Sequence, residues 1–100
     1  MDVSEQVVTI IYQAIDEANE VRPKHEWIEK SREEQLVGTA TKLDSLSLLN
    51  LVVAVEERVN EKFETTIDLS TLLALDPGSS PLRSVSTLAQ HLVARLQAKE

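Results

Sequence analysis

The stretch from Leu43 to Phe63 constrains the fold most, because it predicts one long helix with more apolar surface than a single packing face needs. We expect Asp44 to be the N-cap, since its carboxylate can accept the free amides of a first turn, with the Ser45 hydroxyl pointing outward at the corner. Because each residue of a helix turns by about 100°, one side is assigned to the core: Leu48, Leu51, Val52, Val55 and Val59. A second, narrower stripe beside Ser45 consists of Leu46, Leu49 and Val53, bordered by Asn50, Glu56 and Glu57.

The second stripe has two interpretations. A helix that is apolar all round is usually buried, which would make this a central helix packed on two sides. Alternatively, a small exposed apolar patch with acidic flanks, next to a modifiable serine, has the character of a docking surface for other proteins. The pattern alone leaves both interpretations open.

Two further helices are predicted by apolar residues that recur every three or four positions. The first begins with a capping box, in which Asp2 is the N-cap and Glu5 follows three residues later, and it extends to about residue 20. Its apolar face comprises Val3, Val7, Ile10, Ile11, Ala14, Ile15 and Ala18. The last helix starts near Ser84, and its apolar face comprises Val85, Leu88, Ala89, Leu92, Val93 and Leu96.

A long, highly charged connection over residues 21–42 follows the first helix, which Pro23 ends. A loop of this length without internal structure is unusual, so residues 26–36 can form a short helix. Its anchors in the core would be Trp27, Ile28 and Leu36.

After the central helix, residues 65–67 are expected to be an extended linker with Ile67 in the core. Residues 69–75 fit a short helix, and residues 76–81 a turn-rich loop. Residues 1–100 therefore predict a single all-α domain, a small four-helix bundle of three long helices and one short helix with a long first connection.

Composition excludes several classes of function. The net charge of −7 argues against nucleic acids and anionic membrane surfaces, both of which select basic faces, and it favours basic protein partners. The chain has no cysteine, so it has no disulfide framework and no Cys-based metal site or nucleophile. No apolar stretch approaches a membrane span, and the N-terminus does not read as a signal peptide, so we expect a cytoplasmic protein without membrane insertion.

Nothing in the sequence completes a catalytic or metal site. A nucleophilic serine needs an activating base, and nothing marks His25 or His91 as that base; the residues around Ser45 also do not form a Gly-x-Ser-x-Gly elbow. The run from His25 to Glu29 lacks the second histidine of the His-Glu-x-x-His zinc motif. We therefore expect neither enzymatic activity nor a bound metal.

Asp44-Ser45-Leu46, opening an amphipathic helix that contains Glu56-Glu57, resembles the signature of the acyl carrier protein family. The resemblance runs from the first helix to the last and is strongest over 43–96. Further matching positions are Phe63, Ile67 and the start of the last helix at Val85. It implies the carrier-protein fold, with 4′-phosphopantetheine attached to Ser45 through a phosphodiester.

The resemblance also implies roles for the neighbouring residues. Asp44 and Leu46 would complete the attachment site, with Asp44 read by a phosphopantetheinyl transferase as well as capping the helix. Partner enzymes would contact Leu46, Leu49 and Val53 and be steered by Glu56 and Glu57. These partners would be an acyl- or aminoacyl-loading ligase and downstream synthases or transferases of fatty acid, lipid or secondary-metabolite biosynthesis, with the carrier itself a monomer.

Several positions depart from the family pattern. Lys42 stands where glycine is common, and Ser47 and Asn50 stand where fatty-acid-synthesis carriers often have acidic residues. The segment between Glu57 and Phe63 is also longer. These departures suggest a specialised free-standing carrier, and the sequence does not choose between a fatty, polyketide, aminoacyl or peptidyl cargo. An unmodified helical domain that grips a partner through Leu46, Leu49 and Val53 remains the alternative.

Overall fold

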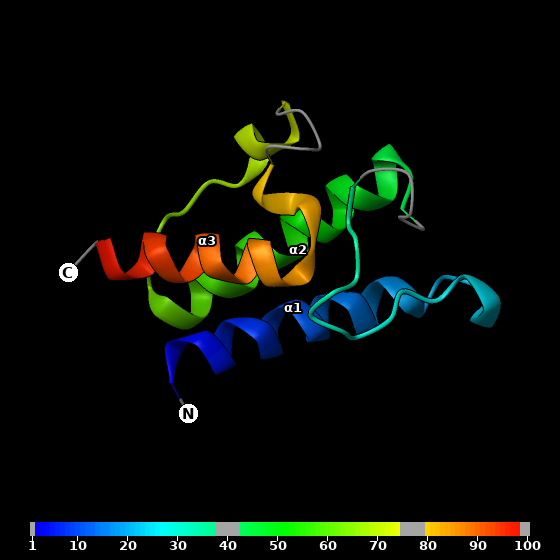
Figure 1. The fold of residues 1–100 in the computed structure, drawn as a ribbon, viewed down its shortest axis with the longest axis horizontal. Helices are drawn as coiled ribbons and strands as arrows, with labels where there is room; N and C mark the ends of the chain where they lie inside the picture. The colour runs from blue at the N-terminus through cyan, green and yellow to red at the C-terminus, as the bar shows by residue number, and fades with distance from the viewer. Residues whose placement is uncertain (1, 38–42, 75–79, 99–100) are drawn as a thin grey trace.

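The computed structural model describes residues 2–37, 43–74 and 80–98. These residues form three α-helices, α1 (Val3–Asn19), α2 (Ser45–Phe63) and α3 (Val85–Ala98), which confirms the all-α prediction. α1 packs against both α2 and α3, and Figure 1 shows it running antiparallel to both. The carboxyl end of α1 therefore lies beside the amino end of α2, which is the end that carries Ser45.

The helices begin where local capping predicts. The backbone amide of Glu5 donates to the Asp2 carboxylate at 2.8 Å, so the first turn of α1 is capped as expected. At the start of α3, the Ser84 amide donates to the Thr87 hydroxyl (2.9 Å), and the Thr87 amide donates back to the Ser84 hydroxyl (3.2 Å). This reciprocal pair satisfies two backbone donors. At its other end α2 stops at Glu64, whose positive φ of 53° is left-handed.

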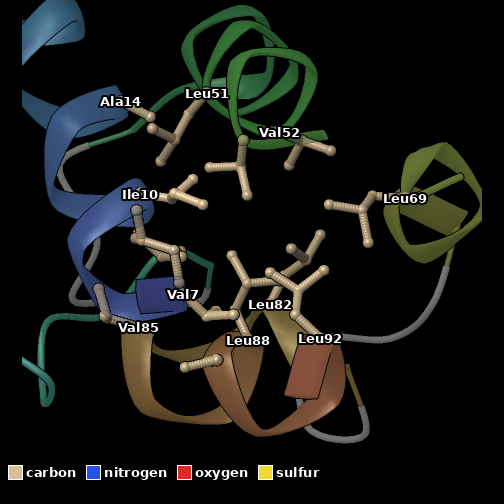
Figure 2. Packing of buried hydrophobic residues seen from close by; sticks show 14 of the residues in the cluster. Val7, Ile10, Ala14, Leu51, Val52, Leu69, Leu82, Val85, Leu88 and Leu92 are labelled. Atoms are coloured by element: carbon tan, nitrogen blue, oxygen red, sulfur yellow. The ribbon is translucent and has the colours of Figure 1, made fainter. Parts of the chain in front are cut away.

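One aliphatic core joins the three helices. Figure 2 shows Val7 and Ile10 of α1 facing Leu51 and Val52 of α2, with side chains of α3 closing the cluster from the other side. The predicted core face of α2 is confirmed at Leu51, Val52, Val55 and Val59, all buried, while Leu48 is partly buried. Burial of these faces is the main favourable contribution to folding.

The first connection differs from the prediction. Residues 26–36 do not form the short α-helix that was expected; only a 3₁₀ turn, η1 (Lys24–Glu26), is helical. The backbone then pairs with the start of α3 instead: Leu36 donates to the Arg83 carbonyl (3.1 Å), and Val85 donates to the Glu34 carbonyl (3.1 Å). The Asn19 side chain clamps the amide and the carbonyl of Ile28, at 2.8 and 3.0 Å. Because these amides and carbonyls form hydrogen bonds with non-local partners, they are not available for the hydrogen bonds of a helix.

Two of the three expected anchors in this connection are confirmed, because Ile28 and Leu36 are buried. Trp27 was wrongly predicted as an anchor, since 45% of its surface is exposed. Its indole N–H donates to the Arg22 carbonyl at 3.1 Å, and the Lys24 ammonium lies 5.9 Å from its ring centre. The ring thus folds back over its own loop.

The prediction of a short fourth α-helix is also wrong within the described residues. Residues 70–74 form a 3₁₀ segment, η2 (Ser70–Ala74), and a second one, η4 (Pro81–Arg83), leads into α3. The α-helical count is therefore three rather than four in the described ranges, and residues 75–79 of the predicted helix and loop lie outside them. The extended linker before η2 is confirmed: Ile67 is buried, and the Asn60 side chain bonds both its amide (2.8 Å) and its carbonyl (2.9 Å).

Candidate functional site

The corner before α2 has the geometry that the sequence predicts. The Asp44 carboxylate accepts the Ser47 amide at 2.7 Å, and the Asp44 carbonyl accepts the Leu48 amide at 2.9 Å, so Asp44 is the N-cap. The hydrogen bond from the Ser47 backbone, followed by one from the Ser47 side chain, holds the pKa of the Asp44 carboxyl below its usual value. The Arg22 guanidinium acts in the same direction. Asp44 is therefore ionised at neutral pH.

Ser45 is the first residue of α2 and is exposed to solvent. Among the described residues, no hydrogen bond involves its hydroxyl, whereas the hydroxyl of Ser47 accepts one from Arg22 (3.3 Å). An exposed oxygen on a capped helix end can be reached by a second protein. The Ser45 hydroxyl is therefore accessible from solvent.

The second apolar stripe of α2 is at the surface. The exposed fractions are 66% for Leu46, 40% for Leu49 and 41% for Val53. The interpretation of α2 as a helix packed on both sides is therefore wrong, and the alternative, an exposed patch beside the serine, agrees with the structure. Large apolar side chains grouped in this way are the usual sign of an interaction surface.

The two glutamates that border the stripe differ in their surroundings. Glu57 is exposed, as steering of a partner requires. Glu56 is only half-exposed, and its carboxylate accepts the backbone amide of Leu69 at 2.6 Å. The Glu56 side chain is therefore held by the segment before η2, and its place at a docking edge stays a prediction.

Arg22, in the connection after α1, also contacts this site, and the sequence analysis did not predict it. Its Nε donates to the Glu26 carbonyl at 2.8 Å, and its Nη1 donates to the Ser47 hydroxyl. The bend of the chain after α1 thus places the Arg22 guanidinium at the amino end of α2. No local pattern could have revealed this, since 25 residues separate Arg22 from Ser47.

A cleft of about 460 Å³ lies between α1 and α2 at this end of the bundle. Small side chains on both helices leave the space, and polar groups of Arg22, Ser47 and Asn50 line it. Its volume is in the range of small-molecule sites, roughly 300–1,000 Å³. The walls are partly charged: Glu17 and Glu26 also contribute, and Glu17 is ion-paired with Arg58.

The remaining candidates stay apart from this site. His25 is exposed and lies 3.7 Å from Glu26, while His91 is half-buried on α3, where desolvation and then Arg95 lower its pKa. The described residues contain no group of three or more His, Asp or Glu side chains able to hold a metal ion. Within the same residues, no helix has the length and apolarity needed to cross a membrane.

The sequence matches no protein-family model, and comparisons with curated proteins and with solved structures gave no significant match.

Proposed function

We propose that this protein is a carrier that bears acyl or aminoacyl groups as thioesters on a 4′-phosphopantetheine arm attached to Ser45. The observation that supports it most strongly is the exposed Ser45 hydroxyl on the first residue of a capped helix, beside an exposed apolar stripe. A carrier needs both features, since the hydroxyl must reach the modifying enzyme and the stripe must meet later partners. In this proposal the chain is a cytoplasmic monomer and not an enzyme.

The residues present fit a phosphodiester at this position. The free amides at the amino end of α2 favour an anion nearby. Asp44 opposes that effect with its own charge, but the Arg22 guanidinium interacts with the Asp44 carboxylate and offsets part of it. On attachment, the Ser45 oxygen forms the new bond to phosphorus, the nucleotide part of coenzyme A leaves, and the hydroxyl proton passes to a base of the transferase. When bound, the arm supplies the thiol that holds the cargo, since the chain has no cysteine.

The fold departs in one respect from the four-helix bundle that the resemblance implies. In place of a short helix between the second and last long helices, this chain has η2, preceded by an extended linker. Partners would meet Leu46, Leu49 and Val53 and be steered by Glu57, with Glu56 contributing through the position of η2. Exposed charges of this kind act on association rate and partner choice more than on affinity.

The test is incubation with coenzyme A and a broad-specificity phosphopantetheinyl transferase, followed by intact mass measurement. We expect one added arm in the native sequence and in Ser47→Ala, and none in Ser45→Ala. Ser47→Ala is the matched control, because it removes the other hydroxyl of the same helical turn. Failure to load this chain under conditions that load a known carrier would refute the proposal.

The exposed stripe also favours a second candidate, an unmodified helical domain that binds a partner through Leu46, Leu49 and Val53. In that case Ser45→Ala keeps cellular function and Leu49→Glu abolishes it. If Ser45→Ala is inactive and the arm is found attached in cells, this candidate is excluded.

A further inference from the structure

A groove of about 630 Å³ lies between the last turns of α1 and residues 27–30, away from the residues that the carrier proposal uses. The chain turns back after η1 and runs along α1 (Figure 1). The Asn19 side chain clamps Ile28 on both its amide and its carbonyl, and the Lys30 ammonium lies 3.2 Å from the Asp16 carboxylate. Because these contacts join the two sides, the groove is formed before any ligand binds, which lowers the cost of binding.

Trp27 lines the groove with an aromatic ring that is 45% exposed. Its indole N–H donates to the Arg22 carbonyl at 3.1 Å, so the ring is held in one orientation at the surface. Aromatic side chains presented in this way are enriched where proteins bind one another. The Lys24 ammonium, 5.9 Å from the ring centre, shows that the ring already attracts a cation from within its own loop.

The charges around the groove favour a cationic ligand. Three carboxylates line it, those of Asp16, Glu20 and Glu29, against the single ammonium of Lys30, which is paired with Asp16. Glu20 and Glu29 are exposed, and no ion pair between described residues involves either of them. The carboxyl end of α1 is also the negative end of its helix dipole, and its last turn has no basic residue. The groove is therefore complementary to positive charge.

The arrangement of these groups suits a guanidinium better than a metal ion. The described residues contain no group of three or more acidic or histidine side chains able to hold a metal, so the three carboxylates are spread along the groove rather than converging on one point. A guanidinium is planar, stacks on aromatic rings and donates hydrogen bonds in several directions. A lysine ammonium is a compact, strongly hydrated point charge and gains less from the ring.

We propose that the groove between α1 and residues 27–30 binds an arginine side chain in a segment of a partner protein. Trp27 supplies the stacking surface, and Glu20 and Glu29 supply the opposite charge. This second docking surface goes beyond the proposed function, because it requires neither the arm on Ser45 nor the exposed stripe of α2.

The experiment titrates the full chain, without the arm, with the peptide acetyl-Gly-Arg-Gly-Arg-Gly-amide and records ¹⁵N–¹H spectra. We expect saturable shifts at the amides of Glu20 and Glu29 and at the indole N–H of Trp27. Because Trp27 is the single tryptophan of the chain, its fluorescence gives a second measure of the same binding. The peptide with glutamine in place of arginine should not bind, the peptide with lysine should bind more weakly, and added salt should weaken binding.

Variants separate this groove from a general attraction to an acidic protein. Glu20→Gln and Glu29→Gln should each weaken binding by about two- to fivefold, the range that one exposed ion pair supports. Glu61→Gln is the matched control, because it makes the same charge change at an exposed position of α2 and should leave the affinity unchanged. Trp27→Leu should also weaken binding, and the exposed glutamate variants keep the test valid if this change disturbs the connection.

Three results would overturn the groove as a docking surface. One is the absence of saturable shifts at the groove, and another is equal binding of the arginine and glutamine peptides. The third is an equal loss of affinity in Glu61→Gln and Glu20→Gln, which would show attraction to the net negative charge alone. None of these results bears on loading of Ser45, so the carrier function is judged separately by intact mass.

Discussion

The Glu56 carboxylate accepts the backbone amide of Leu69 at 2.6 Å, so a side chain in the middle of α2 holds the segment that leads into η2. Leu69 is fully buried and Ser70 is bonded in turn to Asp68, at 2.9 Å from its amide and 2.7 Å from its hydroxyl. η2 is therefore attached to α2 by a charge-assisted hydrogen bond as well as by apolar packing.

Glu56→Ala should destabilise the protein by about 1.5–3 kcal/mol, because it leaves the Leu69 amide without its charged acceptor. Glu56→Gln keeps an oxygen acceptor and should cost less. Glu57→Ala is the matched control at an exposed neighbour and should change the free energy of unfolding by less than about 0.5 kcal/mol. Urea unfolding measures all three. Equal effects at both positions would contradict the structural role of Glu56.

Asp44→Ala should cost about 0.5–2 kcal/mol of stability through loss of the N-cap. Asp44→Asn keeps a capping oxygen, so its thermal unfolding should stay close to that of the native protein. The two variants separate the capping role from recognition: if the transferase reads the charge, Asp44→Asn is stable but is modified more slowly in a mass time course. Modification at the native rate would show that only the cap matters.

Leu46→Glu should leave the fold nearly unchanged but impair transfer from a loading ligase, because Leu46 is 66% exposed and lies on the proposed docking stripe. Leu51→Ala, on the opposite side of α2, should cost about 2–5 kcal/mol, since it removes a buried side chain from the core. Unfolding curves and transfer assays on the two variants check this division. A loss of stability in Leu46→Glu comparable to that in Leu51→Ala would mean that the stripe is packed.

Acidification should weaken the fold through His91. Its Nε2 is buried and has no hydrogen-bond partner among the described residues, and desolvation, with Arg95 nearby, lowers its pKa below the ordinary 6.5. Between the folded and unfolded pKa values the unfolded chain binds more protons, so the free energy of unfolding falls as pH drops through this window. His91→Gln should reduce that dependence when unfolding is measured from neutral pH downward. An unchanged pH profile in the variant would refute it.

Much of this fold follows from local sequence. The three α-helices and their first residues are predictable because apolar spacing and capping side chains act within a few residues of the backbone that they stabilise. Asp2, Asp44 and Ser84 illustrate this, since the side chain of each accepts the backbone amide three positions later. The exposed Ser45 and the two apolar stripes of α2 are consequences of the same helical period.

The tertiary structure decided which stripe of α2 is covered and how the connections run. Residues 26–36 do not form the predicted helix because their backbone bonds to the start of α3, and the Glu56 carboxylate accepts the Leu69 amide. The cleft is lined by Ala14 and Ala18 of α1, Ala54 of α2 and Arg22 of the first connection, which only the packed chain brings together. The partners in these contacts are 13 or more residues apart, as between Glu56 and Leu69, so no local pattern marks them and only the packed chain brings them together.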